Sequence, residues 1–398
     1  MYVNFKSEDL YMVIEPKVRG FICTTAHPEG CRRAVQNQIE VAKKYAGNIS
    51  VGKRVLVIGA STGYGLATRI ALAFGGGCDT LGVMYERAAS GIRTASAGWY
   101  NTAAFEEEAK KAGLYCKSIN GDAFSGEIKA RTVEVIKRDL GRVDAVIYSL
   151  ASPRRTMPDG TVYNSVLKTV NKSFTDKNID LRTNEVGEIT LNPATNEEMD
   201  ATIKVMGGED WAAWIDLLHK NDLLSENAIT LAYSYLGPVL THPIYLNGTI
   251  GLAKRDLYYT AKLMEKKYGI TARVSVNKAL VTQSSSAIPV VPLYISLLYK
   301  VMKAESTHEG CIEQMCRLYS EKLGKYDDEG YIRLDDYEMS DSVQKAVNKA
   351  WKEINTENLH EYADLDGYWQ DFYNMFGFKL DGVDYTADVN PEVNIDDI

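Results

Sequence analysis

The sequence predicts an α/β protein: a doubly wound parallel sheet with insertions and a helical C-terminal extension. Short continuous apolar runs alternate with amphipathic segments between residues 53 and 149, which is typical of parallel strands covered by helices on both faces. A glycine-rich turn follows the first apolar run, and open α/β sheets bind ligands at such carboxyl ends of strands. Right-handed crossovers between successive strands complete the doubly wound arrangement.

The first part of this pattern lies before residue 150. Each expected strand is a short run rich in apolar residues, and an amphipathic stretch follows each of the first three. We expect strands at 54–58, 80–85, 115–119 and 143–149, and helices at 64–74, 102–112 and 125–140.

A polar stretch then interrupts the pattern. Residues 152–196 carry Thr, Asn and Asp at turn positions and alternate in places such as GEITLNP, which indicates a hairpin-bearing insertion beside the sheet. The pattern resumes with a strand at 228–233, a helix at 249–268 that ends at Gly269, and a strand at 272–276. We expect an extra N-terminal segment at 1–11 and a single domain at 12–398, with its core at about 50–305, the insertion at about 152–225 and a helical wrap at about 306–398.

The composition restricts the possible partners. Of 398 residues, 45% are apolar and 25% are charged, as in ordinary globular proteins. The net charge of −8 disfavours nucleic acid or an anionic membrane as a partner, because both require a concentrated basic face. The N-terminus lacks the pattern of a secretory signal, and the most apolar stretch, 287–298, is too short to span a bilayer. We therefore expect a cytoplasmic protein.

The six cysteines are spread along the chain without a Cys-x2-Cys motif, so we expect free thiols in a reducing compartment. Two groups of potential metal ligands lie close together in sequence: Cys23, His27 and Cys31, and His308, Cys311 and Cys316. Neither group completes a ligand set, and we predict no metal site.

The glycine-rich turn predicts a dinucleotide site. Gly59, Gly63 and Gly65 stand in the segment IGASTGYGLA, between the first expected strand and the first expected helix. Residues without a Cβ allow a tight turn and let a pyrophosphate approach the free N–H groups of the helix N-terminus. Unrelated α/β proteins also use glycines in tight turns, but the order of strand, turn and helix favours the dinucleotide-binding turn of a Rossmann fold.

The end of the second expected strand bears on the choice of cofactor. Glu86 stands there, and a carboxylate in this place accepts hydrogen bonds from the adenosine ribose and repels a 2′-phosphate. NADH is therefore favoured over NADPH, although Arg87 follows immediately. The alternative is that Glu86 is a solvated charge at a strand end.

Two further strand ends are expected at the same edge. Asp122 and Ala123 follow the third strand, and Leu150 and Ala151 follow the fourth. Asp122 is placed either to face the adenine or to cap the helix that begins near Ser125, and the sequence does not separate these alternatives.

The segment YLNGTIGLAKRDLYYTAK contains two tyrosine–lysine pairs that suit reductase chemistry. Tyr245 and Lys254 have eight residues between them, whereas Tyr258 and Lys262 have three. Such a reaction requires a phenol that donates a hydrogen bond to an oxygen gaining negative charge. It also requires a cation that holds the cofactor ribose and keeps the phenol acidic.

Positions on the helix at 249–268 separate the two pairs. At about 100° per residue, Lys254 falls inside the single apolar stripe, and Tyr258 and Lys262 fall on its flank. Lysine is rarely buried without a partner, whereas the flanking pair is an ordinary i, i+4 surface pair. Tyr245 must precede the helix to fold back toward Lys254. We therefore favour Tyr245 and Lys254, against the alternative that the ammonium of Lys254 only extends to solvent.

The motifs IGASTGYGLA, AYSYLG, Y-x8-K and VSVNKALVTQSSSAIP closely resemble the FabV and Ter family of NADH-dependent trans-2-enoyl thioester reductases. The likeness begins at Met12 and includes GFICTTAHPEGC, YSLASPRR, VMGGEDW and FGFKLDGVDYTADVNP. Members are enlarged short-chain reductases of the Rossmann type and are usually monomeric. The likeness leaves residues 1–11 without a counterpart and a role.

The resemblance implies NADH as hydride donor, without a flavin, and an enoyl group carried by CoA or by acyl carrier protein. It implies that Tyr245 is the proton donor, that Lys254 holds the cofactor and that Tyr235 contacts the thioester. The residues that match the family's cofactor-binding segments are Gly59, Ala60, Ser61, Thr62, Gly63, Tyr64, Gly65, Tyr85, Glu86, Asp122, Ala123, Leu150, Ala151, Lys254, Leu280, Val281 and Thr282.

The implied reaction reduces the trans-2 double bond to a saturated acyl thioester, in fatty acid synthesis or butyryl-CoA formation. Residues 288–302 then either line an acyl channel or form a core helix. The alternatives are a carbonyl reductase that uses Tyr258 and Lys262, and a non-catalytic NAD-binding sensor.

Overall fold

The computed structural model describes residues 11–395, so almost all of the extra segment expected at 1–11 lies outside the described residues. Its centre is a seven-stranded sheet with the strand order β13-β12-β11-β6-β3-β4-β5, in which every neighbouring pair is parallel. The order reverses direction on either side of β3, which is the doubly wound arrangement that the sequence predicts.

Six of these strands are the ones expected from apolar runs. The sheet contains β3 (Arg54–Ile58), β4 (Asp79–Met84), β5 (Cys116–Asn120), β6 (Val143–Tyr148), β11 (Leu224–Ser234), β12 (Thr271–Val276) and β13 (Ile332–Arg333). The chain after His308 is mostly helical, as expected, but it also contributes the short strand β13, which pairs with β12 at the sheet edge. Two residues are too few to show a strand pattern.

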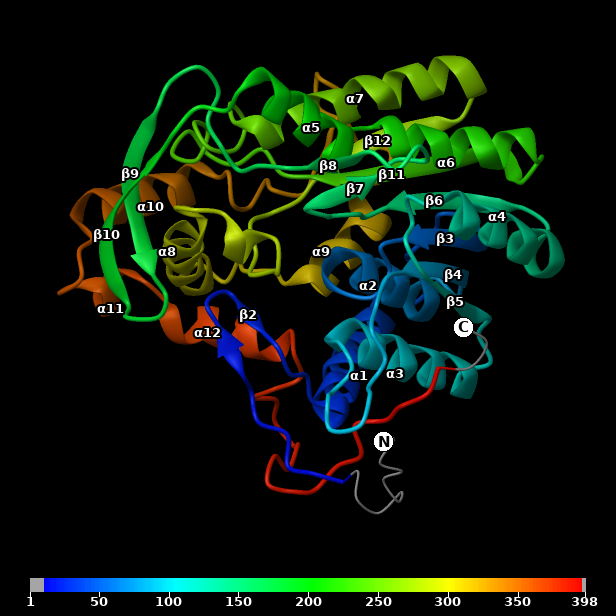
Figure 1. Ribbon diagram of the computed structural model, residues 1–398, viewed down its shortest axis with the longest axis horizontal. Helices are drawn as coiled ribbons and strands as arrows, with labels where there is room; N and C mark the ends of the chain where they lie inside the picture. The colour runs from blue at the N-terminus through cyan, green and yellow to red at the C-terminus, as the bar shows by residue number, and fades with distance from the viewer. Residues whose placement is uncertain (1–10, 396–398) are drawn as a thin grey trace.

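Helices cover both faces of the sheet (Figure 1). Val55 and Val57 of β3 pack toward one face, whereas Leu56 and Ile58 pack toward the other, as the alternation of a strand requires. The first face carries α1 (Pro28–Lys43), α2 (Gly63–Ile70), α3 (Ala97–Lys111) and α9 (Cys311–Arg317), and the second carries α4 (Gly126–Val135), α6 (Glu209–Lys220) and α7 (Thr249–Tyr268).

The helix boundaries differ from expectation at a few places. The helix α3 begins at Ala97, five residues before the expected Thr102, because Gly98 and two aromatic residues weaken the helical pattern of its first turn. The helices α2 and α4 each continue into a π-helical turn. Gly269 ends α7 in the left-handed conformation (φ 67°), as expected for a C′ glycine.

The insertion after β6 does contain hairpins, and it also contributes to the sheet cover. It consists of β7 (Arg154–Thr156), β8 (Val162–Asn164), β9 (Phe174–Asp180), β10 (Glu185–Leu191), α5 (Asn196–Met206) and α6. The buried Trp211 and Trp214 of α6 belong to the core beneath the sheet. The insertion therefore completes one face of the sheet.

A third buried cluster lies beside the sheet (Figure 1). It is centred on α8 (Val291–Ala304) and includes α10 (Asp341–Glu353), α11 (Leu359–Tyr362) and α12 (Leu365–Asn374). The short hairpin of β1 (Val18–Arg19) and β2 (Ile22–Cys23) precedes α1. No helix in residues 11–395 has the length and apolar character needed to cross a bilayer.

Candidate active site

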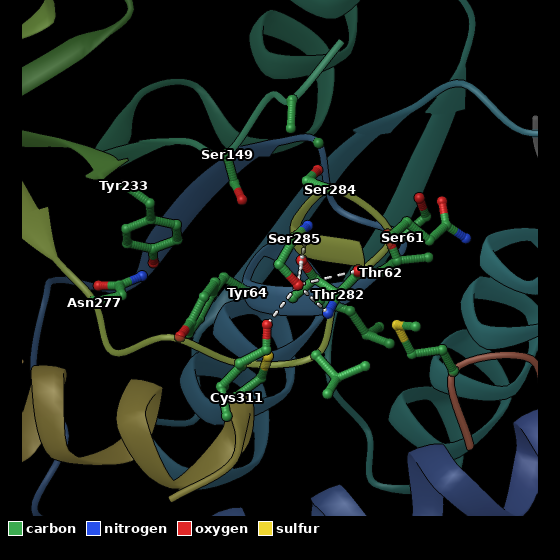
Figure 2. Close-up of a pocket in the computed structure, with 18 of the residues that line it drawn as sticks. Ser61, Thr62, Tyr64, Ser149, Tyr233, Asn277, Thr282, Ser284, Ser285 and Cys311 are labelled. Atoms are coloured by element: carbon green, nitrogen blue, oxygen red, sulfur yellow. Dashed lines mark hydrogen bonds between the residues drawn. The ribbon is translucent and has the colours of Figure 1, made fainter. Parts of the chain in front are cut away.

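A cavity of about 790 Å³ opens at the carboxyl edge of the sheet. Figure 2 shows Ser61 and Thr62 of the glycine turn near Thr282 and Ser285, which belong to the loop after β12. All the predicted site residues line this cavity except Ala60 and Gly65. The fold therefore brings residues from 59 to 282 to one place.

The glycine turn leaves no room for side chains. Gly59 has φ 84°, and a Cβ on it would lie 2.3 Å from the carbonyl oxygen of Ser149. A Cβ on Gly65 would lie 1.8 Å from the carbonyl oxygen of Gly59, so Gly65 supports the turn from behind. Thr62 precedes α2 without a side-chain cap, and the first N–H groups of that helix stay available to an anion. The turn therefore fits a pyrophosphate.

Glu86 is held beside this turn. Its Oε1 accepts a hydrogen bond from the hydroxyl of Ser61 (2.6 Å). Its backbone N–H donates to Oδ1 of Asn120 (2.8 Å), and the amide of Asn120 donates back to its carbonyl oxygen (2.9 Å). Gly98 makes room for the carboxylate, because a Cβ there would lie 2.0 Å from Oε1. This half-buried, oriented carboxylate favours the ribose interpretation over a freely solvated charge. Tyr85 stands at the rim, 78% exposed.

The structure separates the two alternatives for Asp122. The hydroxyl of Ser125 caps α4 by accepting from the N–H of Ile128 (3.2 Å). The carboxylate of Asp122 instead accepts from the N–H of Phe124 (2.9 Å) and lines the cavity with Ala123. The helix-capping interpretation of Asp122 was wrong, because a cap three residues further along already occupies that role.

The two tyrosine–lysine pairs lie in different surroundings. Lys254 is half-buried, lines the cavity and donates from Nζ to the carbonyl oxygen of Tyr233 (3.2 Å). Burial lowers the pKa of Lys254 to about 8. Tyr258 donates to the carbonyl oxygen of Glu329, and the ammonium of Lys262 lies 4.3 Å from the centre of the Tyr258 ring. The second pair lies outside the residues that line the cavity.

Tyr245 precedes α7 in a series of turns, as the sequence requires. Its ring meets the ring of Tyr235 edge to face, with centroids 4.8 Å apart. Within residues 11–395, no side chain or backbone group hydrogen-bonds the Tyr245 hydroxyl, and burial raises its pKa. A protonated phenol is therefore free to donate to a ligand in the cavity.

The loop after β12 lines the cavity near the glycine turn (Figure 2). The N–H of Val281 donates to the hydroxyl of Tyr299 (3.2 Å), and the N–H of Thr282 donates to the hydroxyl of Ser285 (2.8 Å). The structure confirms that residues 288–302 include a core helix, α8, and the acyl channel stays a prediction. Val291 and Ile295 line the cavity, whereas most other residues of α8 are core.

Sequence reasoning missed Asn120 and Glu338. Asn120 ends β5 at the ligand-binding edge, so its position was a signal that could have identified it. Glu338 lies in a turn after β13, where it accepts a hydrogen bond from Tyr235 (2.9 Å). No local pattern marks Glu338.

The fold and the site together define a dinucleotide-dependent oxidoreductase of the Rossmann class. The family model for the trans-2-enoyl-CoA reductase catalytic region matches residues 93–324, and the model for the NAD(P)H binding domain of that enzyme matches residues 13–91. The chain belongs to the trans-2-enoyl-CoA reductase family.

Curated relatives and solved structures agree with this assignment. The chain is 54% identical to trans-2-enoyl-CoA reductase [NADH] of Ruminiclostridium cellulolyticum, covering 97% of this chain and 99% of the relative. It is 57% identical to enoyl-[acyl-carrier-protein] reductase [NADH] of Flavobacterium johnsoniae, covering 97% and 100%. It superposes with a TM-score of 0.93 on the trans-2-enoyl-CoA reductase of Treponema denticola solved in complex with NAD, at 48% identity over 96% of this chain and 100% of that one.

A third family model, described as an enoyl reductase FAD binding domain, matches residues 326–389. In the structure this segment consists of β13, α10, α11, α12 and turns. Gly367 and Gly377 pack against other atoms: a Cβ on Gly367 would lie 2.2 Å from Nζ of Lys303, and one on Gly377 would lie 2.5 Å from the N of Cys31. Within the described residues, the segment has no strand, glycine turn and helix in succession. The described part of this segment therefore shows no Rossmann-type glycine turn for a dinucleotide.

Proposed function

We propose that this protein reduces the trans-2 double bond of enoyl thioesters with NADH and releases the saturated acyl thioester. The observation that carries the proposal is the Tyr245 hydroxyl, which has no partner within residues 11–395 and stands in the same cavity as Lys254 and the glycine turn. The names of the relatives from Ruminiclostridium cellulolyticum and Flavobacterium johnsoniae support this choice of substrate.

The glycine turn and Glu86 would hold the pyrophosphate and the adenosine ribose of the cofactor. Lys254 would hold the nicotinamide ribose. When bound, the reduced nicotinamide supplies the hydride that adds to Cβ of the enoyl thioester. Negative charge then develops on the thioester oxygen, where a hydrogen bond from Tyr245 becomes stronger than in the ground state. Protonation at Cα completes the saturated product.

The apolar lining from α8 suits the acyl chain. Val291, Ile295 and the preceding Ile288 face the cavity, and an apolar wall excludes water from the reacting double bond. Of the two packed tyrosines that line the cavity, Tyr235 would contact the thioester and Tyr245 would donate to its oxygen.

We infer that NADH alone supplies the electrons, since the glycine turn that suits a dinucleotide lies in the same cavity as Tyr245 and Lys254. The carrier would be CoA or acyl carrier protein, and both present the enoyl group as a thioester. The chain is expected to act as a cytoplasmic monomer with a single domain over 12–398.

Oxidation of NADH in the presence of crotonyl-CoA tests the proposal, with butyryl-CoA identified by mass spectrometry. A matched assay with a ketone in place of the enoyl thioester tests the carbonyl reductase alternative. Turnover of the ketone alone would replace the proposed function by that alternative. Tight NADH binding without turnover of either substrate would identify a sensor.

A further inference from the structure

Glu338 is a fully buried carboxylate next to the cavity, with none of its surface exposed. Its Oε1 accepts hydrogen bonds from the hydroxyls of Tyr235 (2.9 Å) and Tyr294 (2.7 Å). Its Oε2 accepts from the backbone N–H of Ala279 (2.7 Å). Burying a charge is costly unless hydrogen bonds compensate for the lost water. The three hydrogen bonds therefore stabilise the buried carboxylate of Glu338 and hold its two oxygens in place.

This contact fixes the direction in which the Tyr235 hydroxyl donates its hydrogen bond. Because its hydrogen points to Glu338, only its oxygen is left to face the cavity. Its half-buried ring is also restrained, because it is tied at its hydroxyl and packs against the ring of Tyr245. The ring of Tyr245 packs edge to face on it at 4.8 Å and has no hydrogen bond of its own within the described residues. The position of Tyr245 thus depends on Tyr235.

The turn that carries Glu338 is itself firmly held. The guanidinium of Arg317 donates to the carbonyl oxygen of Leu334 (2.8 Å) and to the carboxylate of Asp336 (2.8 Å). The amide of Gln344 donates to the carbonyl oxygen of Glu338 (2.7 Å). These bonds come from α9 and α10, so two helices fix the carboxylate relative to the sheet.

We propose that Glu338 is a positioning residue of the reductase site, which takes the hydroxyl hydrogen of Tyr235 and thereby sets the rings of Tyr235 and Tyr245 against the thioester. The inference rests on the proposed function. It assigns to the segment 326–389 a task in the enoyl reductase site, namely to supply an acceptor to the substrate-facing tyrosines. Of Tyr235 and Tyr245, only Tyr245 then has a hydroxyl hydrogen that is free to bond the thioester oxygen.

The substitution Glu338→Gln has a predictable geometry. The N–H of Ala279 is a fixed donor, whereas a tyrosine hydroxyl rotates between donating and accepting. The new amide should therefore turn its oxygen to Ala279 and its NH2 group to the tyrosines. The Tyr235 hydrogen then swings into the cavity, while the loop that begins at Ala279 stays in place.

Steady-state kinetics of the full-length protein tests this inference. Losing a hydrogen bond to a charged group should lower kcat/KM for crotonyl-CoA about ten- to hundredfold in Glu338→Gln, with the KM for NADH nearly unchanged. Tyr235→Phe should have a similar effect. Adding Glu338→Gln to Tyr235→Phe should cost no more than about twofold further, because residues that act through one contact are not additive.

Tyr294→Phe is the matched control. It removes the other hydroxyl from the same carboxylate oxygen but lies outside the residues that line the cavity, so kcat/KM should stay within about threefold of wild type. A loss as large as that of Glu338→Gln would overturn the inference, as would full additivity of Glu338→Gln and Tyr235→Phe.

Urea unfolding measures the same coupling without turnover. The free energies of unfolding are compared for wild type, Glu338→Gln, Tyr235→Phe and the double variant. Their stability losses should be non-additive, and additive losses would overturn the inference even in an inactive protein. Wild type that fails to reduce crotonyl-CoA but shows coupled stability losses would contradict the proposed function and not the contact.

Discussion

The two ends of the cavity are built in different ways. At the cofactor end, Ser61 donates to Glu86, only 25 residues later in the chain, and the turn itself is made of backbone. At the reaction end, Tyr235 donates to Glu338, 103 residues later. The glycine turn of the predicted cofactor end is thus a local structure of a strand, a turn and a helix, whereas the predicted reaction end is assembled by tertiary packing of side chains.

This difference indicates which substitutions each end of the cavity tolerates. The glycine turn depends on residues without a Cβ and on free N–H groups between β3 and α2. The tyrosines instead depend on a distant turn and on helices α9 and α10. Changes at the cofactor end should therefore alter the handling of NADH alone, whereas changes at the reaction end should alter the chemistry of the acyl group.

The largest effect is expected from Tyr245→Phe. Removing one hydrogen bond made in the transition state should lower kcat about 10²- to 10³-fold, with circular dichroism and the KM for NADH nearly unchanged. Tyr258→Phe is the control, because Tyr258 lies outside the cavity lining and should change kcat only slightly. The reverse ranking of the two variants would break the comparison and favour the carbonyl reductase alternative.

The charge of Lys254 should give an intermediate effect that depends on pH. Burial lowers the pKa of Lys254 to about 8. The side chain therefore carries a positive charge below about pH 8 and loses that charge above it. We expect kcat/KM for NADH to fall about tenfold per pH unit above about pH 8. Lys254→Arg keeps its charge and should move this fall to higher pH. A wild-type profile that stays flat well above pH 8 would contradict a role for this charge in holding NADH.

The smallest effect is expected for the choice between NADH and NADPH. Glu86→Ala removes the carboxylate that would repel a 2′-phosphate, and the ratio of kcat/KM values should shift toward NADPH by about tenfold. Ser61→Ala, which removes only the partner of Glu86, should shift the ratio less. Equal kcat/KM for NADH and NADPH in wild type would show that Glu86 does not select the cofactor. The glycine turn would then be the part of the cofactor end that still has a predicted role.

Much of the fold was predictable because its signals are local. The strands β3, β4 and β6 are apolar runs at the expected places, and Gly269 ends α7 where the pattern stops. The apolar stripe placed Lys254 inward and the pair of Tyr258 and Lys262 on the flank, as the structure has them. These features follow from the periodicity of one element and require no knowledge of its neighbours.

The failures share the opposite property. The strand β13 exists only because it pairs with β12, and Asp122 lost the capping role because Ser125 was better placed for it. The helical start at Ala97 depends on burial of the aromatic residues that follow it. In each case a contact or a competing group decided an outcome that propensity left open.

The sequence by itself determined the individual strands β3, β4 and β6, the glycine turn after β3 and the side of α7 on which Lys254 lies, because each depends on residues close together in the chain. Only the tertiary structure decided that the Tyr235 hydroxyl donates to Glu338 and that the Tyr245 hydroxyl stays free within the described residues. A hydrogen bond between residues 103 positions apart leaves no periodic trace in the chain, since its partners meet only after the helices between them have packed.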